Sequence, residues 1–185
     1  MKRLNLTPLA LTLLLATVAC GKVQEKASEK VAEAAIESAM KQQGAKDAHV
    51  DLSTGGVKTT VTDKDGKQQT LELNTAQITE ADLGLPFYPG TKPAEGAANR
   101  MTNDQGVAMT LNLVTKDALD KVVAFYDPQI KKAAAGKQLV ESSGPTEHMW
   151  MVAPDNGKEY GGFTVQAQRS GDSTEIQIMA THAKK

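Results

Sequence analysis

Histidine is the residue best suited to acid–base chemistry and metal binding near neutral pH, and this sequence of 185 residues contains three histidines. His49, His148 and His182 are scattered, and none has a histidine, cysteine or acidic neighbour at metal-ligand spacing. Glu147 directly precedes His148, but adjacent residues of a β-strand point to opposite faces of the sheet. The histidines therefore predict neither a metal site nor a catalytic pair, and no cofactor is expected.

Other catalytic patterns are absent from the sequence, which has no nucleophile elbow, phosphate-binding glycine loop, zinc-ligand spacing or kinase signature. Ser142-Ser143-Gly144 lacks the strand–turn–helix context that a nucleophilic serine needs. Asp63, Asp65 and Gly66 match part of a calcium-binding loop, but its further oxygen ligands and closing glutamate are missing. Turn chemistry accounts for these residues, and the sequence favours a protein that is not an enzyme.

Cys20 is the only cysteine of the chain, and it follows a segment with the layout of a secretory signal peptide. Lys2 and Arg3 provide a positive start, and apolar residues are densest over residues 9–19. This apolar run is about 11 residues long, whereas a membrane-spanning helix needs about 20. We therefore expect residues 1–19 to be a removed signal peptide.

The sequence Ala16-Thr17-Val18-Ala19-Cys20-Gly21 resembles the lipobox of bacterial lipoproteins. The resemblance implies cleavage before Cys20 and attachment of a thioether-linked diacylglycerol, which anchors the protein in a membrane. The family usually has an aliphatic residue in place of Thr17, and the alternative is an ordinary signal peptide cut after Ala19 that leaves a free thiol. Because Gly21 is not aspartate, the resemblance implies sorting to the outer membrane, facing the periplasm or the cell surface, if the source is Gram-negative.

The charge of the chain limits its partners. Lys2 and Arg3 are two of the 21 basic residues, so the rest of the chain carries 19 basic and 22 acidic residues, a net charge of −3. This mild negative charge argues against a nucleic-acid partner, which would require a basic patch. One cysteine cannot form an intramolecular disulfide, so stability must come from a hydrophobic core, and the length suits one domain.

Residues 20–44 are expected to form the lipidated N-terminus and a helical tether. Alanine, glutamate, lysine and glutamine dominate this segment, and Gly44 is suited to end the helix. Its thin apolar stripe consists of Val23, Ala27, Val31, Ala34 and Ala35. The helix could be a stalk, a partner-binding helix or a coiled-coil segment, but these small side chains favour a solvated spacer packed lightly on the domain.

Residues 45–78 change to the alternating apolar and polar pattern of short strands. The alternating apolar residues are Val50, Leu52, Val57, Val61, Leu71 and Leu73. Gly55-Gly56 and Asp63-Lys64-Asp65-Gly66 predict hairpin connections between them. The segment is therefore predicted to be an antiparallel β-meander of two or three strands.

Residues 79–95 predict a proline-rich crossing. Thr79 is suited to cap a short helical turn that ends near Leu85. The prolines that force the extended path after it are Pro86, Pro89 and Pro93. Phe87 and Tyr88 either pack into the core and pin the crossing, which we favour, or present an aromatic surface to a partner.

Residues 96–185 predict two strands, a helix and further strands. The helix is expected to begin at a Thr115 cap and to kink or end near Tyr126, because Pro128 interrupts its pattern; the alternative to an end there is a second turn that runs to Ala135 and is closed by Gly136. Later strands are expected over residues 137–142, 147–153, 159–169 and 174–183, and Gly161-Gly162 marks a bulge or a close backbone approach. We expect residues 45–185 to form one globular unit. The fold class is then α+β, with an N-terminal helix followed by an antiparallel β-sheet that has one main helix packed on a face.

Trp150 lies in the segment Glu147–Ala153, both faces of which are largely apolar. Such a strand is either covered on two sides or half-exposed at a binding surface. As the only tryptophan, Trp150 is the sharpest candidate for a partner contact, since tryptophan is enriched at binding hot spots. Core packing is nevertheless the favoured interpretation.

Two short motifs, Pro86-Phe87-Tyr88-Pro89-Gly90 and Val122-Val123-Ala124-Phe125-Tyr126, resemble those of a loose group of bacterial lipoproteins. That group combines a P-x-YPG turn and a V-x-x-FY helix with an antiparallel meander, and has no assigned activity. The resemblance covers most of the chain and implies architecture and cell-envelope location only.

Three classes of function follow from these observations. The favoured one is a lipid-anchored cell-envelope protein that acts as a non-catalytic structural or protein-interaction module. The alternative is a periplasmic small-ligand or lipid-binding module with a groove between sheet and helix. An enzyme is the third and least favoured class.

Overall fold

The computed structural model describes residues 21–53, 55–91, 93, 97–155 and 158–184. Cys20 and residues 1–19 therefore lie outside the described residues. The described elements are α1 (Gly21–Gln42), β1 (Asp47–Asp51), β2 (Val57–Thr62), β3 (Gln68–Leu73), α2 (Glu80–Leu83), β4 (Ala98–Thr102), β5 (Gly106–Thr115), α3 (Leu119–Ala133), β6 (Leu139–Ser143), β7 (Glu147–Val152), β8 (Phe163–Ser170) and β9 (Ser173–Ala183). None of the described helices is long and apolar enough to cross a membrane.

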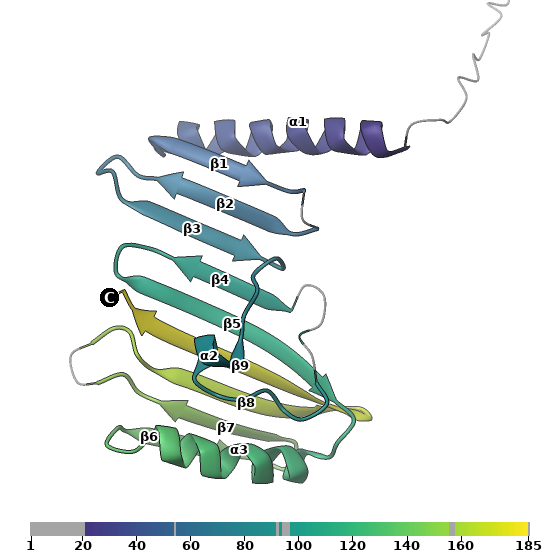
Figure 1. The fold of residues 1–185 in the computed structure, drawn as a ribbon, viewed down its shortest axis with the longest axis vertical. Coiled ribbons are helices and arrows are strands. Elements are labelled where there is room, and N and C mark those ends of the chain that lie inside the picture. The colour runs from purple at the N-terminus through teal and green to yellow at the C-terminus, as the bar shows by residue number, and fades with distance from the viewer. Residues whose placement is uncertain (1–20, 54, 92, 94–96, 156–157, 185) are drawn as a thin grey trace, which may run out of the picture.

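The described strands form one sheet in the order β1-β2-β3-β4-β5-β9-β8-β7-β6, and every neighbouring pair is antiparallel (Figure 1). Neighbours in the sheet are also neighbours in sequence, except for β5 and β9. That pair is aligned over ten residue pairs, from Gly106↔Ala183 to Thr115↔Thr174. The sheet therefore consists of two meanders that meet at the β5–β9 pair.

The expected N-terminal helix, antiparallel sheet and helix packed on a face are present. The meander predicted for residues 45–78 is confirmed as β1, β2 and β3. The sheet, however, makes up most of the fold, and α1 with 22 residues is longer than α3 with 15. The expectation of one main helix is therefore confirmed only in part.

The hydrophobic core lies between the β5–β9–β8–β7 part of the sheet and a layer made of α3, which packs on β8 and β7, and of α2 with the proline-rich crossing, where α2 packs on β9 (Figure 1). α3 contributes Val122, Tyr126 and Ile130, which recur at helical spacing and are fully buried. The sheet contributes alternate residues of its strands, of which Leu111, Leu113, Trp150, Val165, Ile176 and Ile178 are fully buried. Because of this alternation, one face of the sheet lies in the core and the opposite face lies outside it.

The predicted start of α3 is wrong. Its N-cap is Ala118, which makes no side-chain cap bond, while Thr115 ends β5 and accepts the Asp117 N–H at 3.2 Å. At its other end the helix does not stop at Tyr126 but continues through Pro128 to Ala133, close to the predicted second turn to Ala135. Pro128 and Ala124, whose carbonyl has no N–H partner at the proline, are both exposed residues. Burial of Val122, Tyr126 and Ile130 therefore stabilises the helix by more than it loses through the backbone hydrogen bond that Pro128 cannot donate.

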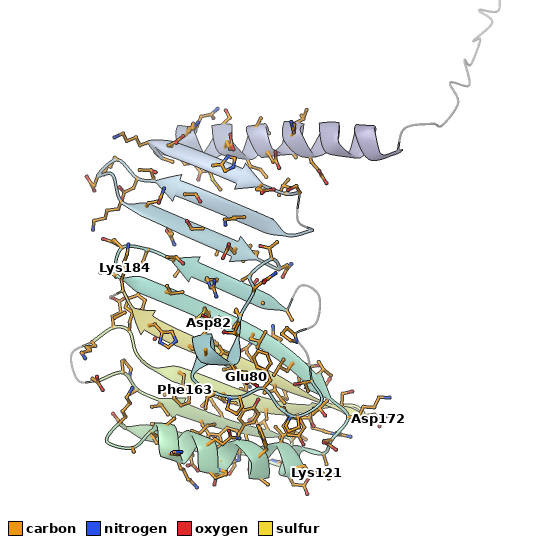
Figure 2. All side chains as sticks on the ribbon, viewed as in Figure 1. Glu80, Asp82, Lys121, Phe163, Asp172 and Lys184 are labelled. Atoms are coloured by element: carbon orange, nitrogen blue, oxygen red, sulfur yellow. The ribbon has the colours of Figure 1, made fainter. Side chains whose placement is uncertain are left out.

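The proline-rich crossing follows the prediction. Thr79 caps α2, forming a capping box with Asp82, and Gly84 ends the helix in the left-handed conformation at φ 68°. The Glu80 carboxylate accepts the Phe87 N–H at 2.7 Å and so ties the crossing to α2, which lies in front of β9 (Figure 2). Tyr88 is buried in the core, which confirms that at least one aromatic residue pins the crossing.

β8 begins later than predicted, at Phe163 and not at residue 159. The expected close approach at Gly162 is confirmed, because an added Cβ would lie 2.7 Å from the Val152 carbonyl oxygen.

α1 lies along β1, the strand at one edge of the sheet (Figure 1). Glu37 accepts the Val50 N–H and Glu33 accepts the Leu52 N–H, both at 2.8 Å. The Ala48 N–H bonds to its neighbour Asp47 at 3.0 Å. Three alternate backbone donors of the edge are thus bonded to carboxylates, which makes this edge a poor template for another strand.

The predicted apolar stripe of α1 is wrong where its side chains are described. Val31 is 71 % exposed, and Ala34 and Ala35 are exposed as well. The half-buried positions are instead Glu29, Glu33, Glu37 and Met40. The helix faces an edge strand, and it therefore presents acceptors for backbone donors and not a hydrophobic seam.

Candidate interaction surface

The sheet face opposite α3, here called the open face, carries a continuous row of uncharged residues across eight strands. Strand register aligns, in order, Val57, Leu73, Asn99, Thr110, Met179, Thr164, Met151 and Val140. We call this the central row. A second row beside it consists of Leu71, Met101, Ala108 and Thr181.

Exposed apolar side chains of the strands concentrate on the open face. Among the described strand residues, the large hydrophobic side chains that are exposed are Val114, Val140, Met151 and Met179, at 39–53 %. All four lie on the open face by register. Val140, Met151 and Met179 lie in the central row, with Thr164 between the two methionines, and Val114 lies apart beside Glu175. Scattered exposed hydrophobic residues are ordinary, but their concentration on one face favours an interaction surface.

The charge of the open face is as distinctive as its apolar content. Lysine and arginine do not occur on it among the described strand residues, because Lys58, Arg100 and Arg169 point to the opposite face. Its charged strand residues are Glu147 and Glu175, which lie in one end row with Gln168. An uncharged centre with charge confined to the rim is the composition of a protein–protein interface.

A shallow hollow interrupts the open face near this end. It has a volume of about 260 Å³, and carboxamides from three strands line it. Gln177 Nε2 donates to Asn112 Oδ1 at 3.1 Å, and Gln166 is the register partner of Gln177 on β8. These amides supply both hydrogen-bond donors and acceptors, and Glu175 adds one carboxylate to the lining of the hollow.

A second depression, about 440 Å³, lies beside the first turns of α3 and next to the β6–β7 turn. Polar residues at its margin include Asp120, Asp127 and His148. His148 packs against Trp150 with ring centroids 4.1 Å apart, and its buried Nε2 has no hydrogen-bond partner in the described structure. No group of three or more potential ligands suited to a metal ion occurs among the described residues.

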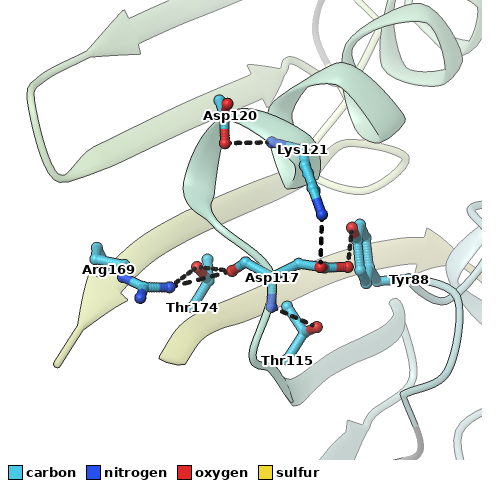
Figure 3. A network of polar contacts seen from close by, with 7 residues as sticks. All are labelled: Tyr88, Thr115, Asp117, Asp120, Lys121, Arg169 and Thr174. Carbon is cyan, nitrogen blue, oxygen red and sulfur yellow. Dashed lines mark hydrogen bonds and ion pairs between the residues drawn. The ribbon is translucent and has the colours of Figure 1, made fainter. Parts of the chain in front are cut away.

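A polar network fixes the connection between β5 and α3 (Figure 3). The Tyr88 hydroxyl donates to Asp117 Oδ2 at 2.8 Å, and Lys121 Nζ lies 3.2 Å from Oδ1. The fully buried Thr174 donates its hydroxyl to the Asp117 carbonyl at 2.7 Å, and Arg169 also donates to that carbonyl, at 3.2 Å. The network satisfies polar groups at the end of the core, which is a structural role.

The same contacts shift two pKa values. Burial, together with the hydrogen bond to the Asp117 carboxylate, raises the pKa of Tyr88 to about 12. The hydrogen bond from Tyr88, followed by the one from Lys121, lowers the pKa of Asp117. Both shifts favour the neutral phenol and the ionised carboxylate, which is the pairing that the geometry requires.

The aromatic candidates from the sequence belong mainly to the core. Trp150 is fully buried and Tyr88 is 6 % exposed, so neither presents a surface to a partner, and Phe87 is half-buried against the same cluster.

The two remaining histidines lie apart from each other in the fold. His49 Nδ1 lies 3.2 Å from Glu37 Oε1, and His182 Nε2 lies 2.5 Å from the Asp82 carbonyl oxygen. Cys20 lies outside the described residues.

The space beneath α3 is filled by side chains. Leu111, Tyr126 and Trp150 are fully buried there, and Phe125 packs against them. The space directly beneath α3 is therefore packed, and the depression of about 440 Å³ described above lies at the margin of the helix, between its first turns and the β6–β7 turn.

Sequence reasoning did not identify the open face, although β7 carried a signal for it. The two apolar faces of that strand are explained by Trp150 in the core and by Met149 and Met151 on the open face. The remaining members of the central row are single residues on separate strands. They become a surface only when the strand order is known.

Comparison of the chain with protein-family models, with curated proteins and with solved structures finds no match. The function has to be argued from the geometry.

Proposed function

We propose that this chain is a lipid-anchored cell-envelope protein whose sheet domain acts as a protein-interaction module. The observation that supports this proposal is the central row, in which eight consecutive strands present uncharged side chains on one face. A sheet is stable in water when at least one face is covered, and exposed hydrophobic side chains such as Met151 and Met179 on the second face favour a further layer. We therefore assign the open face to another protein surface.

The shape of the face favours a protein over a small molecule. Small-ligand sites are concave and bury most of the ligand, whereas the hollow on the open face has a volume of only about 260 Å³. The uncharged row extends over far more strands than this hollow does. Recognition by a broad surface fits this geometry better than recognition by a pocket.

The anchor is proposed from the lipobox resemblance at Cys20 and is tested separately. In the native host, Cys20→Ser is expected to abolish labelling by a fatty-acid analogue and to move the protein from the membrane fraction to the aqueous fraction. Ser28→Ala, in the same terminal segment, serves as the matched control and should leave both properties unchanged. Continued membrane partition of the Cys20→Ser protein would contradict the lipid anchor.

The interaction is tested with a photocrosslinking amino acid placed at Met179 in cells. Met179 is 39 % exposed in the middle of the central row. Lys132, which is exposed on α3 and is far from this face in the fold, is the control position. We expect an adduct with a protein at Met179 and not at Lys132. Adducts at neither position, or equally at both, would refute the proposed use of the open face.

A further inference from the structure

We propose that the occupant of the open face is a second copy of this chain, so that two sheets pack face to face as a sandwich. This inference rests on the proposed function and names the partner. Stacked sheets are separated by about 10 Å, and side chains of the two inner faces interdigitate across that space. The unbranched methionine side chains at positions 151 and 179 suit such packing, because methionine adapts to an irregular partner surface.

The charge pattern favours a surface that meets itself. A face with a net charge in its centre would repel its own copy, since like charges across an interface are costly. The central row and the second row contain no charged residue. Glu147 and Glu175 lie in the end row, where water can reach them. A strongly charged partner would find little on this face to pair with.

The polar groups of the face are also self-complementary. Each carboxamide carries both a donor and an acceptor. With a two-fold axis along the strands, Asn112 of one copy faces Gln177 of the other, and the two amides can bond to each other. A row of carboxylates or of ammonium groups could not do this. The hollow thus supplies hydrogen bonds that two identical faces can exchange.

The area of the face matches that of a stable dimer. Eight strands about 4.8 Å apart span roughly 34 Å, and four rows about 6.6 Å apart span roughly 20 Å. Each copy would then contribute on the order of 700 Å², or about 1,400 Å² in total, within the range of stable interfaces.

Association through the β1 edge is disfavoured. Glu33 and Glu37 already accept the N–H groups of Leu52 and Val50. A strand from another copy would have to displace these carboxylates before it could pair with β1. The open face has no such cover over Met151 and Met179, which are 42 % and 39 % exposed.

The symmetry of the proposed dimer identifies the residue to test. A two-fold axis between two stacked faces lies in the interface plane, so residues near the centre of the face meet their own copies. Thr110 and Met179 are paired across β5 and β9 and occupy the middle of the central row. Met179 therefore lies close to its symmetry mate whether the axis runs along the strands or across them.

The experiment uses the full chain, extracted from membranes with detergent and treated with a short bismaleimide. Met179→Cys is expected to give a covalent dimer of this chain, shown by coexpression of two differently tagged copies. Lys132→Cys and the unsubstituted protein, which reports any reaction of Cys20, are expected to remain monomeric on denaturing gels. In sedimentation, Met151→Asp combined with Met179→Asp should convert the dimer to a monomer with an unchanged circular dichroism spectrum.

The outcomes separate this inference from the proposed function. A monomer in sedimentation, together with a Met179 adduct to a different protein in cells, would overturn the second copy as partner and leave the interaction module standing. A monomer in sedimentation, together with no Met179 adduct to another protein or to a second copy, would overturn both the interaction module and the second copy as its partner. A dimer that Met151→Asp and Met179→Asp leave intact would place the contact elsewhere and refute the inference as stated.

Discussion

The carboxylate of Glu37 accepts the backbone N–H of Val50 at 2.8 Å, so that a helix side chain completes the outer edge of a strand. Glu33, one helical turn earlier, does the same for Leu52. Residues four apart on a helix lie on one side, and residues two apart on a strand point in the same direction. The spacing of the two glutamates therefore matches the spacing of the two donors, and α1 is joined to the sheet by backbone recognition.

This arrangement predicts that Glu33→Ala and Glu37→Ala will expose the β1 edge. Each hydrogen bond to a charged acceptor at this half-exposed site should contribute about 1 kcal/mol. Amide hydrogen exchange at Val50 and Leu52 is expected to accelerate in the matching variant. Ser38→Ala, on the exposed side of the same helix, is the control. Unchanged protection of both amides in the double variant would contradict the role of the glutamates.

The Tyr88–Asp117 pair predicts a loss of stability in alkaline solution. The folded protein raises the pKa of Tyr88 from its ordinary value of 10.0 to about 12. Between these values the unfolded chain releases the phenol proton while the folded chain retains it, so unfolding becomes progressively more favourable. Denaturant titrations from pH 9 to pH 12 should show a smaller decline for Tyr88→Phe than for the unsubstituted protein. If the free energy of unfolding declined equally in the two proteins, Tyr88 would not be the group responsible for the loss of stability.

The same pair predicts the opposite behaviour in acid. Because the pKa of Asp117 is lowered in the folded state, its stabilising effect is present above the ordinary value of 3.8 and is lost as the pH falls through the folded value. Asp117→Asn should therefore reduce the sensitivity of the unfolding midpoint to pH between about 5 and 2. Asp65→Asn, at an exposed turn, is a suitable comparison and should leave the profile unchanged.

Trp150 is predicted to be the most costly side chain to truncate. It is fully buried, and Trp150→Ala should lower the free energy of unfolding by about 3–5 kcal/mol. Phe87→Ala removes a half-buried ring and should cost clearly less. Chemical denaturation followed by far-ultraviolet circular dichroism measures both. The fluorescence of the unsubstituted protein, which comes from this single tryptophan, should be blue-shifted and protected from acrylamide.

Gly162 is predicted to tolerate no side chain. An added Cβ would lie 2.7 Å from the Val152 carbonyl oxygen and 2.9 Å from Pro154 Cδ, and neither group can move freely. At Gly144 the nearest atom would be the flexible Glu147 Cγ at 3.3 Å. Gly162→Ala should therefore lower the melting temperature by several degrees, and Gly144→Ala by little. Similar changes in melting temperature for the two variants would contradict the close approach of Gly162 to Val152 and Pro154.

Local patterns of the sequence predicted much of the secondary structure. Alternation located the strands, and the Thr79 cap and Gly84 fit the short α2. The failures arose where tertiary packing outweighed local preference. Pro128 was expected to kink or end α3, but the helix continues to Ala133, and its buried stripe runs from Val122 to Ile130.

The candidate surface could not be derived from the sequence for a different reason. Alternation divides each strand into two faces but does not say which face a helix covers. Met151 and Val57 share a row only because β5 pairs with β9 and so joins two meanders. That pairing leaves no local trace in the sequence. The carboxylates of α1 likewise looked like a solvated face until the edge strand beside them was known.

The β5–β9 pair also has a consequence for how the chain folds. Every other strand pairing joins strands that are consecutive in the sequence, the longest connection being residues 74–97 between β3 and β4, whereas this one joins residues 59 to 77 positions apart, from Thr115↔Thr174 to Gly106↔Ala183. Closing a long loop costs more conformational entropy than closing a hairpin, and non-local pairing slows folding. The two meanders can therefore form early and independently. The alignment of β9 against β5 is then the slow, committing step, and it is the step that creates the open face.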